Sequence, residues 1–447
     1  MEATLENQPS VTVIGGGLAG CEAAWQAARR GVKVHLLEMR PLVMTPVHRT
    51  PHLAELVCSN SLGSMSQGSA PGLLKEELRL LDSLVMEAAD HSRVPAGQAL
   101  AVDRDVFSSS VEKALLSRPE VTLTRKEECL IPAGSITVLA TGPMTSEAMV
   151  QSLQAVTGSD YLYFYDAVSP VVSLESLDST RMFRASRYGK GEGEYLNCPL
   201  SEEEYGAFHR ELTGAGEVEA HQHEQKFFEG CLPVEEIAKR GRDTLRFGPM
   251  KPVGLNDPAT GQTPYAVVQL RQENREGTLY NLVGFQTRLT WSEQRRVFRM
   301  IPALREAEFV RLGVMHRNIF INAPRHLEPY GSMRGSEGLF IAGQLSGVEG
   351  YMESTASGLL CGINAALKAR GEPMVRLPAT TALGALMEHI TTARPEDFQP
   401  MGINFGLITA LEKRIKKKAE RNKVIRERAL RDLGEFIEKE GLLRRRE

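Results

Sequence analysis

The first residues with a chemical signature are glycines near the start of the chain. They fit the pattern GxGxxG, in which the first glycine permits a tight turn, the second lets the backbone approach a pyrophosphate and the third allows close packing of a helix. Glu38 follows the last glycine by 18 residues, and a carboxylate at that spacing can accept a hydrogen bond from a ribose hydroxyl. The pattern consists of Gly15, Gly16, Gly17, Leu18, Ala19 and Gly20. This combination predicts a site for a dinucleotide cofactor.

Two later glycine-containing segments favour FAD over NAD as that dinucleotide. One is Ala-Thr-Gly at 140–142, which ends at Gly142, and the other runs through 343–351. FAD is long enough to need both ends of the chain, with its adenosine end at the first glycines and its ring where the late glycines start a helix. The late segment adds Gly343, Gln344 and Gly347 to the predicted cofactor residues. Simple helix packing is the alternative, and it explains poorly why these glycines precede the helix.

The six cysteines are widely spaced and form no CxxC or CxxxC pattern. The sequence therefore predicts neither a zinc site nor a disulfide framework, and we expect no metal. Cys58 and Cys231 stand in polar or glycine-broken segments, where a thiol can be reached by a substrate and act as a nucleophile. From the residues alone, however, a structural thiol is the favoured interpretation for each. Cys21 and Cys361 fall in expected helices and are interpreted as packing residues.

The glycine patterns need strands and helices to position them. β-branched runs that end in glycine alternate with helical patterns at both ends of the chain, which is typical of βαβ units. We expect strands at 11–15, 32–37, 136–140 and 338–343 and helices at 18–30 and 354–370. The fold class is therefore α/β, a doubly wound FAD-binding domain of the Rossmann-like, glutathione-reductase type.

The middle of the chain has a different texture. Short alternating segments such as 266–270 and 279–283 are divided by glycine and proline, which is typical of an α+β domain. We therefore predict that an inserted domain interrupts the FAD-binding domain. The predicted limits are 10–165 and 316–447 for the discontinuous FAD-binding domain, which ends in a basic helix, and 166–315 for the inserted α+β domain.

Charge is distributed unevenly along the chain. The net charge is −3, from 53 Lys and Arg against 56 Asp and Glu, and as an average it indicates no nucleic-acid partner. Between Lys413 and Arg431, however, there are ten basic and only two acidic residues. Leu407, Leu411 and Ile415 recur every four residues, so we predict a helix from Leu407 with one apolar face. Its basic residues could neutralise several phosphates.

Nothing in the sequence predicts a membrane protein. No apolar run approaches the ~18 residues of a membrane span, and the first ten residues carry Glu2 and Glu6 without an apolar signal core. We expect a cytoplasmic location and no membrane partner.

Four further segments form a distinctive set. They are ELVCSNSLGS at 55–64, GLLKEEL at 72–78, HRNIFIN at 316–322 and GQLSGVEGY at 343–351. In these segments, and from about residue 11 to the basic C-terminal stretch, the chain resembles the TrmFO family, the folate- and FAD-dependent tRNA (uracil-5-)-methyltransferases formerly called Gid. The related, longer flavoproteins that modify the wobble uridine share the glycine motifs but lack the stretch Val-Cys-Ser-Asn-Ser.

The resemblance implies methylation of C5 of the T-loop uridine in tRNA, giving 5-methyluridine. It implies that 5,10-methylenetetrahydrofolate supplies the carbon, that reduced FAD supplies electrons, and that NADPH or NADH re-reduces the flavin. C5 of uracil is a poor nucleophile until a group adds to C6, and a thiolate is the usual side chain for that addition. The resemblance assigns this role to Cys231 and places Cys58 near the flavin, where it would assist methylene or proton transfer.

The resemblance also bears on the other ligands. A flat pterin needs an aromatic lid and a carboxylate for its amino edge, and Tyr351 and Glu349 are the candidates for binding the folate. The chain has no second GxGxxG, so we expect NAD(P)H to dock transiently at the flavin. The expected oligomeric state is a monomer or a weak homodimer. The T arm of tRNA would contact the basic stretch through Lys413, Arg414, Lys416, Lys417 and Lys418.

The sequence is also compatible with three other functions. A plain NAD(P)H-flavin oxidoreductase would need neither the basic stretch nor loop cysteines. A non-catalytic RNA-binding flavoprotein is the second alternative. The third is the related flavoprotein type that modifies the wobble uridine of tRNA.

Overall fold

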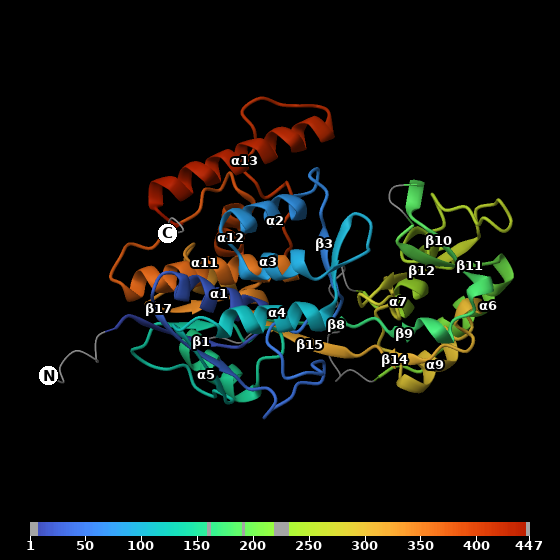
Figure 1. Ribbon diagram of the computed structural model, residues 1–447, viewed down its shortest axis with the longest axis horizontal. Helices are drawn as coiled ribbons and strands as arrows, with labels where there is room; N and C mark the ends of the chain where they lie inside the picture. Colours follow the sequence, from blue (N-terminus) through green and yellow to red (C-terminus); the bar gives the residue numbers. More distant parts are fainter. Residues whose placement is uncertain (1–7, 159–161, 190–192, 219–231, 444–447) are drawn as a thin grey trace.

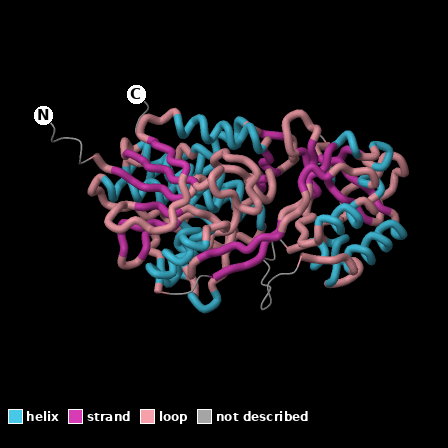
Figure 2. The backbone as a smooth tube through the Cα atoms, turned by 90° about the horizontal axis from the view of Figure 1, so that it is seen from below, coloured by secondary structure: helices cyan, strands magenta, loops and turns pink. Residues whose placement is uncertain are grey.

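A computed structural model describes residues 8–158, 162–189, 193–218 and 232–443 of the chain. Two groups of strands, each with its own helices, are joined by a pair of long strands (Figures 1 and 2). The strands are β1 Ser10–Ile14, β2 Lys33–Glu38, β3 Ser61–Ser64, β4 Arg93–Val94, β5 Ala99–Val102, β6 Val121–Arg125, β7 Thr137–Leu139, β8 Leu162–Ala167, β9 Val171–Ser173, β10 Phe183–Ala185, β11 Tyr195–Leu200, β12 Ala266–Gln272, β13 Leu279–Leu282, β14 Phe309–Arg311, β15 Met315–Phe320, β16 Ser332–Met333 and β17 Ser336–Ile341. The α-helices are α1 Leu18–Arg29, α2 Ala70–Leu80, α3 Leu84–His91, α4 Arg104–Leu116, α5 Glu147–Thr157, α6 Glu202–Thr213, α7 Val234–Lys239, α8 Thr244–Phe247, α9 Trp291–Phe298, α10 Ala323–His326, α11 Tyr351–Ala369, α12 Ala382–Thr392 and α13 Lys418–Glu440.

The first sheet combines the two ends of the chain. Its order is β16-β17-β7-β1-β2-β6, and only the β16–β17 pair is antiparallel. The β-branched run of β1 is in the middle, where Val13 pairs with Leu36 of β2 and Val138 of β7. The strand at the start of the chain and the late strand β17 therefore belong to one parallel sheet, on either side of β7, with their carboxyl ends at one edge.

Two helices that begin at glycine segments pack directly on each other next to this sheet. Helix α1 follows β1, and α11 starts at Tyr351 after the late glycines. A Cβ at Gly358 or Gly362 of α11 would lie 2.2 Å or 2.4 Å from carbonyl oxygens of α1. The two backbones touch because neither position carries a side chain, so the late helix fixes the start of the early one.

The second sheet, with order β10-β11-β12-β13-β9-β14, consists of antiparallel pairs and has its own hydrophobic core. The antiparallel pair β8–β15 carries the chain between the two sheets (Figure 1). A small sheet, β3-β5-β4, belongs to the first part of the chain. The predicted domain limits at 165/166 and 315/316 fall inside β8 and β15, and they stay a prediction.

The prediction of a helix from Leu407 is wrong. Helix α13 covers Lys418–Glu440, and the stretch before it is not helical. There the N–H of Thr409 donates to the carbonyl of Ala379 at 3.1 Å. The carbonyl of Thr409 in turn accepts from the Arg428 guanidinium. These long-range bonds satisfy backbone groups that a helix would have paired internally. The four-residue apolar spacing reflects an irregular segment whose leucines pack on the core.

Candidate functional site

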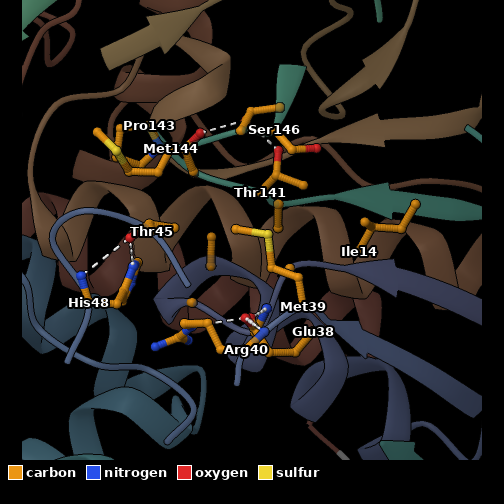
Figure 3. Close-up of a pocket in the computed structure, with 18 of the residues that line it drawn as sticks. Ile14, Glu38, Met39, Arg40, Thr45, His48, Thr141, Pro143, Met144 and Ser146 are labelled. Carbon is orange, nitrogen blue, oxygen red and sulfur yellow. Dashed lines mark hydrogen bonds and ion pairs between the residues drawn. The ribbon is translucent and has the colours of Figure 1, made fainter. Parts of the chain in front are cut away.

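A pocket opens at the carboxyl ends of β1, β2 and β7 and has a volume of about 1080 Å³, its mouth included. The position and size suit a nucleotide-type ligand in an open parallel sheet. In Figure 3, Glu38 and Arg40 lie on one side of the view and Thr141 and Ser146 on the other. The lining includes these predicted cofactor residues: Gly15, Gly16, Gly17, Leu18, Ala19, Glu38, Gly142, Gly343 and Gln344. Gly20 and Gly347 are not part of the lining.

Close backbone contacts explain two of the first glycines. Gly15 has φ of +105°, and a Cβ there would lie 2.4 Å from the carbonyl oxygen of Ala140. A Cβ at Gly20 would lie 1.8 Å from the carbonyl oxygen of Gly15. No side chain fits at either position, and α1 can begin directly against the turn. Gly20 therefore does not line the pocket but allows α1 to start close to the glycine turn that does.

Gly17 is different, because a Cβ there would meet nothing within 4 Å. It is the N-cap of α1, with φ of −77°, and no side chain caps the helix. Gly17, Leu18 and Ala19 line the pocket, so the backbone N–H groups at the start of α1 have open space before them. A helix N-terminus of this kind binds phosphate through its N–H groups and its dipole. These residues fit the pyrophosphate of a dinucleotide.

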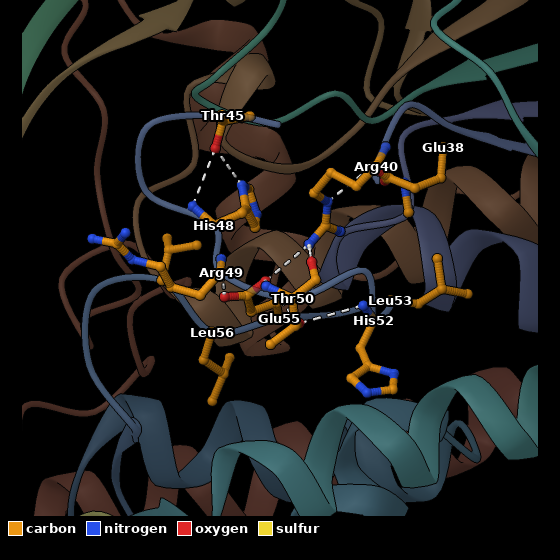
Figure 4. A network of polar contacts seen from close by, with 12 residues as sticks. Glu38, Arg40, Thr45, His48, Arg49, Thr50, His52, Leu53, Glu55 and Leu56 are labelled. Carbon is orange, nitrogen blue, oxygen red and sulfur yellow. Dashed lines mark hydrogen bonds and ion pairs between the residues drawn. The ribbon is translucent and has the colours of Figure 1, made fainter. Parts of the chain in front are cut away.

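Glu38 is held by a buried ion-pair network (Figure 4). Its carboxylate accepts from the N–H of Gly16 at 2.7 Å and from Nε of Arg40 at 2.9 Å. Arg40, only 2% exposed, also donates to Glu55 at 3.1 Å. Burial alone would raise the pKa of Glu38, but the charge and hydrogen bonds of Arg40 bring that pKa below its usual value. The carboxylate is thus ionised and fixed against the glycine turn.

The loop after β2 adds residues that the sequence analysis did not single out. Thr45 and His48 line the pocket, and Oγ1 of Thr45 lies 2.6 Å from Nδ1 of His48. Burial, together with the charge of Arg40, lowers the pKa of His48 to about 4, so this ring is neutral at pH 7. No sequence motif marks Arg40 or His48 as members of the site, and only their burial and contacts identify them. Glu55, by contrast, begins the segment ELVCSNSLGS.

Tyr351 connects the pocket to Cys58. Tyr351 lines the pocket, and its hydroxyl oxygen accepts hydrogen bonds from the backbone N–H of Cys58 at 2.7 Å and of Ser59 at 3.2 Å. Burial raises the pKa of the Tyr351 phenol, which is therefore neutral. Sγ of Cys58 lies 3.7 Å from the carbonyl oxygen of Ala167, at the end of β8. The structure thus brings together two residues that are 293 positions apart in sequence.

Three arginines from separate elements hold the loop that carries Cys58. Arg104 donates to the carbonyl of Leu56 and pairs with Glu273 at 2.8 Å. Arg271 of β12 donates to Oγ of Ser59 at 2.7 Å and to Oδ1 of Asn60 at 2.9 Å.

The third of these, Arg311 of β14, donates to the carbonyl of Val57. Burial and the neighbouring charge of Arg104 lower the pKa of the Arg311 guanidinium to about 10. The inserted sheet is thereby bonded to the Cys58 loop, a feature with no sequence signature.

The remaining predicted residues do not line the pocket or lie outside the described residues. Cys231 lies outside the described residues. Glu349 accepts from Nε2 of Gln344 at 2.7 Å but does not line the pocket. A Cβ at Gly347 would lie 2.5 Å from the ring of Phe398, so this glycine serves the turn before α11. Cys21, Cys198 and Cys361 are fully buried, and burial raises the pKa of each thiol.

The predicted tRNA-binding residues are exposed where the chain leads into α13. Four precede the helix, and Lys418 is its first residue. Within the described part of the chain, none of the five forms an ion pair, whereas Arg426 on the same helix pairs with Glu76 at 2.8 Å. The cations before α13 are therefore available to an outside anion.

No group of three or more His, Cys, Asp or Glu side chains among the described residues could hold a metal ion. No helix among the described residues has both the length and the apolar character to cross a membrane.

The fold has a known counterpart. Residues 10–373 match the family model described as Glucose inhibited division protein A. A structure of Aquifex aeolicus GidA superposes with a TM-score of 0.71 at 17% identity, covering 99% of this chain and 75% of that chain. At that identity the likeness concerns the fold alone. The predicted class is confirmed: a Rossmann-like α/β domain of the FAD-binding type with an inserted domain.

The curated relatives are more specific. Three proteins are each named methylenetetrahydrofolate--tRNA-(uracil-5-)-methyltransferase TrmFO. That of Geobacter sulfurreducens is 59% identical over 430 residues, which is 96% of this chain and 99% of the relative. Those of Moorella thermoacetica and Natranaerobius thermophilus are 59% and 57% identical, over 94% and 96% of this chain and 96% and 99% of the relatives. The chain therefore belongs to the TrmFO family, and the resemblance inferred from the four segments is confirmed.

Proposed function

We propose that this protein methylates C5 of the T-loop uridine of tRNA, with 5,10-methylenetetrahydrofolate as the carbon donor. The observation that carries the proposal is the 59% identity over 96% of the chain with a protein whose name specifies that donor, tRNA and uracil C5. The proposal also includes four features expected from the sequence. They are the T-loop position of the uridine, reduction of the flavin by NADPH or NADH, a monomeric or weakly dimeric state, and a cytoplasmic location.

The pocket at the carboxyl ends of β1, β2 and β7 is the proposed FAD site. Open space at Gly17 and the uncapped start of α1 would take the pyrophosphate, and Glu38 would face a ribose. Gly343 and Gln344 line the other side, where the ring end would lie. Bound there and reduced by NADPH or NADH, the flavin would supply the two electrons that bring the methylene carbon of the folate to a methyl group.

The protein's own groups have separate proposed tasks. Tyr351 offers its ring as a wall for the flat pterin, while its hydroxyl keeps the Cys58 loop at the pocket. Glu349, beside Gln344, is the proposed partner of the pterin's amino edge. Cys231 would add to C6 of uracil, which makes C5 nucleophilic, and would leave when the C5 proton departs. Cys58 would assist methylene or proton transfer.

The proposal is tested by incubating the purified, yellow protein with an unmodified tRNA transcript, labelled methylenetetrahydrofolate and NADPH. We expect the labelled folate carbon in 5-methyluridine at the T-loop position. Oxidation of NADPH without label in the RNA would instead support a plain flavin oxidoreductase. Label at the wobble position would support the related flavoprotein type.

The basic residues before α13 give a quantitative prediction. Replacing Lys416 and Lys417 together by alanine should flatten the plot of log Kd for tRNA against log salt by up to about two units, because each phosphate contact contributes ~0.9.

The control removes two exposed lysines elsewhere, Lys33 of β2 and Lys113 of α4. If the control changes the slope as much as the Lys416/Lys417 variant does, general charge explains the effect and this contact is wrong.

A further inference from the structure

Two aromatic side chains of the inserted domain project into solvent. Tyr188, in the turn between β10 and β11, is 61% exposed, and Phe247, the last residue of α8, is 82% exposed. The aromatic residues Tyr205, Phe208 and Phe285 of the same domain are fully buried in its core. A single exposed ring is ordinary on a protein surface. Whether these two rings have a function must therefore be judged from the residues around them.

The backbone of Tyr188 is held in an unfavourable conformation. Its φ of +60° and ψ of 24° fall in the left-handed region, which a bulky aromatic residue rarely adopts. The N–H of Tyr188 donates to the carbonyl of Gly254 at 2.8 Å. The ring lies against Gly254, where a Cβ would come within 2.9 Å of two ring carbons. The fold thus maintains a strained backbone that keeps an aromatic ring at the surface, and such strain concentrates at functional sites.

Two basic residues are close to the rings in the chain: Arg187 precedes Tyr188, and Lys251 follows Phe247 by four residues. The Arg187 guanidinium donates to the carbonyls of Lys251 at 2.5 Å and Val253 at 3.1 Å, which connects the Tyr188 turn to the segment that follows Phe247. Among the described residues, neither Arg187 nor Lys251 forms an ion pair. No carboxylate of the described residues therefore neutralises either charge.

Arg187 also contacts the strand that holds the Cys58 loop. Nε of Arg187 donates to Oε1 of Gln269 on β12 at 3.0 Å. Two residues along that strand, and therefore on the same face and ~7 Å away, Arg271 contacts Ser59 beside Cys58. Strand β12 thus connects Arg187, the neighbour of Tyr188, to the Cys58 loop.

We propose that Tyr188 and Phe247, together with Arg187 and Lys251, form a stacking platform for unpaired bases of the RNA substrate. Aromatic rings stack on any base, and neighbouring cations take the phosphates, which is the chemistry of proteins that bind single-stranded nucleic acid. The inference rests on the proposed function for the identity of the substrate. It adds a second RNA contact, on the inserted domain, to the cations before α13.

The test measures the Kd of the full-length, flavin-containing protein for an unmodified tRNA transcript. Tyr188→Gly should weaken binding by about tenfold, and Phe247→Ala by a similar factor. Glycine adopts a φ of +60° freely, so the unfolding temperature of Tyr188→Gly should not fall. Tyr188→Phe keeps the ring and should bind like the wild type. Neither ring removal should alter the salt slope, whereas Lys251→Ala should lower it by about one unit.

The matched control is Trp291→Ala, which removes a ring that is 56% exposed at the start of α9, and we expect its Kd to stay within about twofold of the wild type. Wild-type affinity in both Tyr188→Gly and Phe247→Ala would overturn the platform. If these variants instead lose self-association, the surface is a contact between copies of the chain. A wild-type protein that binds tRNA but forms no 5-methyluridine would refute the proposed function and leave the platform standing.

Discussion

Replacement of Cys58 by alanine should lower the rate of methyl transfer by a factor on the order of 10³ or more, while the protein stays yellow. The geometry makes this substitution conservative. Tyr351 is held by backbone N–H groups, which alanine retains, and the thiol makes a weak contact to the Ala167 carbonyl at 3.7 Å. The change therefore removes the sulfur and little else, so a large loss would be chemical.

The measurement is single-turnover formation of 5-methyluridine, with flavin absorbance and unfolding temperature recorded on the same sample. Cys231→Ala should give the same result, with activity abolished and flavin bound. If the two thiols act as a unit, the double variant will be no worse than either single one. Cys129→Ala is the matched control, because that thiol is also free and partly exposed. Full activity in Cys58→Ala would remove this residue from the mechanism.

The sequence predicted well what depends on neighbouring residues. The predicted first strand, 11–15, and helix, 18–30, correspond to β1 at Ser10–Ile14 and α1 at Leu18–Arg29. The reason is local: a β-branched run, a turn that only glycine allows and an alanine-rich helix all lie within 20 residues. The contribution of both ends of the chain to one doubly wound domain also followed, because strands that end in glycine occur at both ends, and β1, β7 and β17 lie in one sheet.

Long-range polar contacts were not predictable. Arg271 reaches Asn60 across 211 positions, and Arg40 pairs with Glu55 in a loop without regular structure. A single arginine in a strand has no spacing that identifies its partner, since only the folded chain determines which carbonyl or carboxylate it meets. The C-terminal error has the same origin: the periodicity of Leu407, Leu411 and Ile415 is real, but bonds to distant residues replaced the helix.

Gly17→Ala should lower the affinity for FAD by between about 10-fold and 100-fold without destabilising the apoprotein. In the protein itself a Cβ at this position meets nothing within 4 Å, and a φ of −77° suits any residue. The methyl group would instead occupy the space in front of the first N–H groups of α1, where the pyrophosphate would lie in the proposed FAD site. Overpacking at a well-fitted contact costs ~1–3 kcal/mol. Titration of apoprotein with FAD, beside thermal unfolding without FAD, measures both quantities.

Gly20→Ala provides the contrast that makes this prediction specific. Its Cβ would lie 1.8 Å from the carbonyl oxygen of Gly15, so α1 must shift away from the turn whether or not FAD is present. We expect the unfolding temperature of this apoprotein to fall by roughly 5 °C together with the loss of FAD affinity. A loss of affinity with unchanged stability in Gly17→Ala, but with lower stability in Gly20→Ala, separates contact with the cofactor from construction of the turn. If Gly17→Ala binds FAD as tightly as the wild type, the pyrophosphate does not lie at the start of α1.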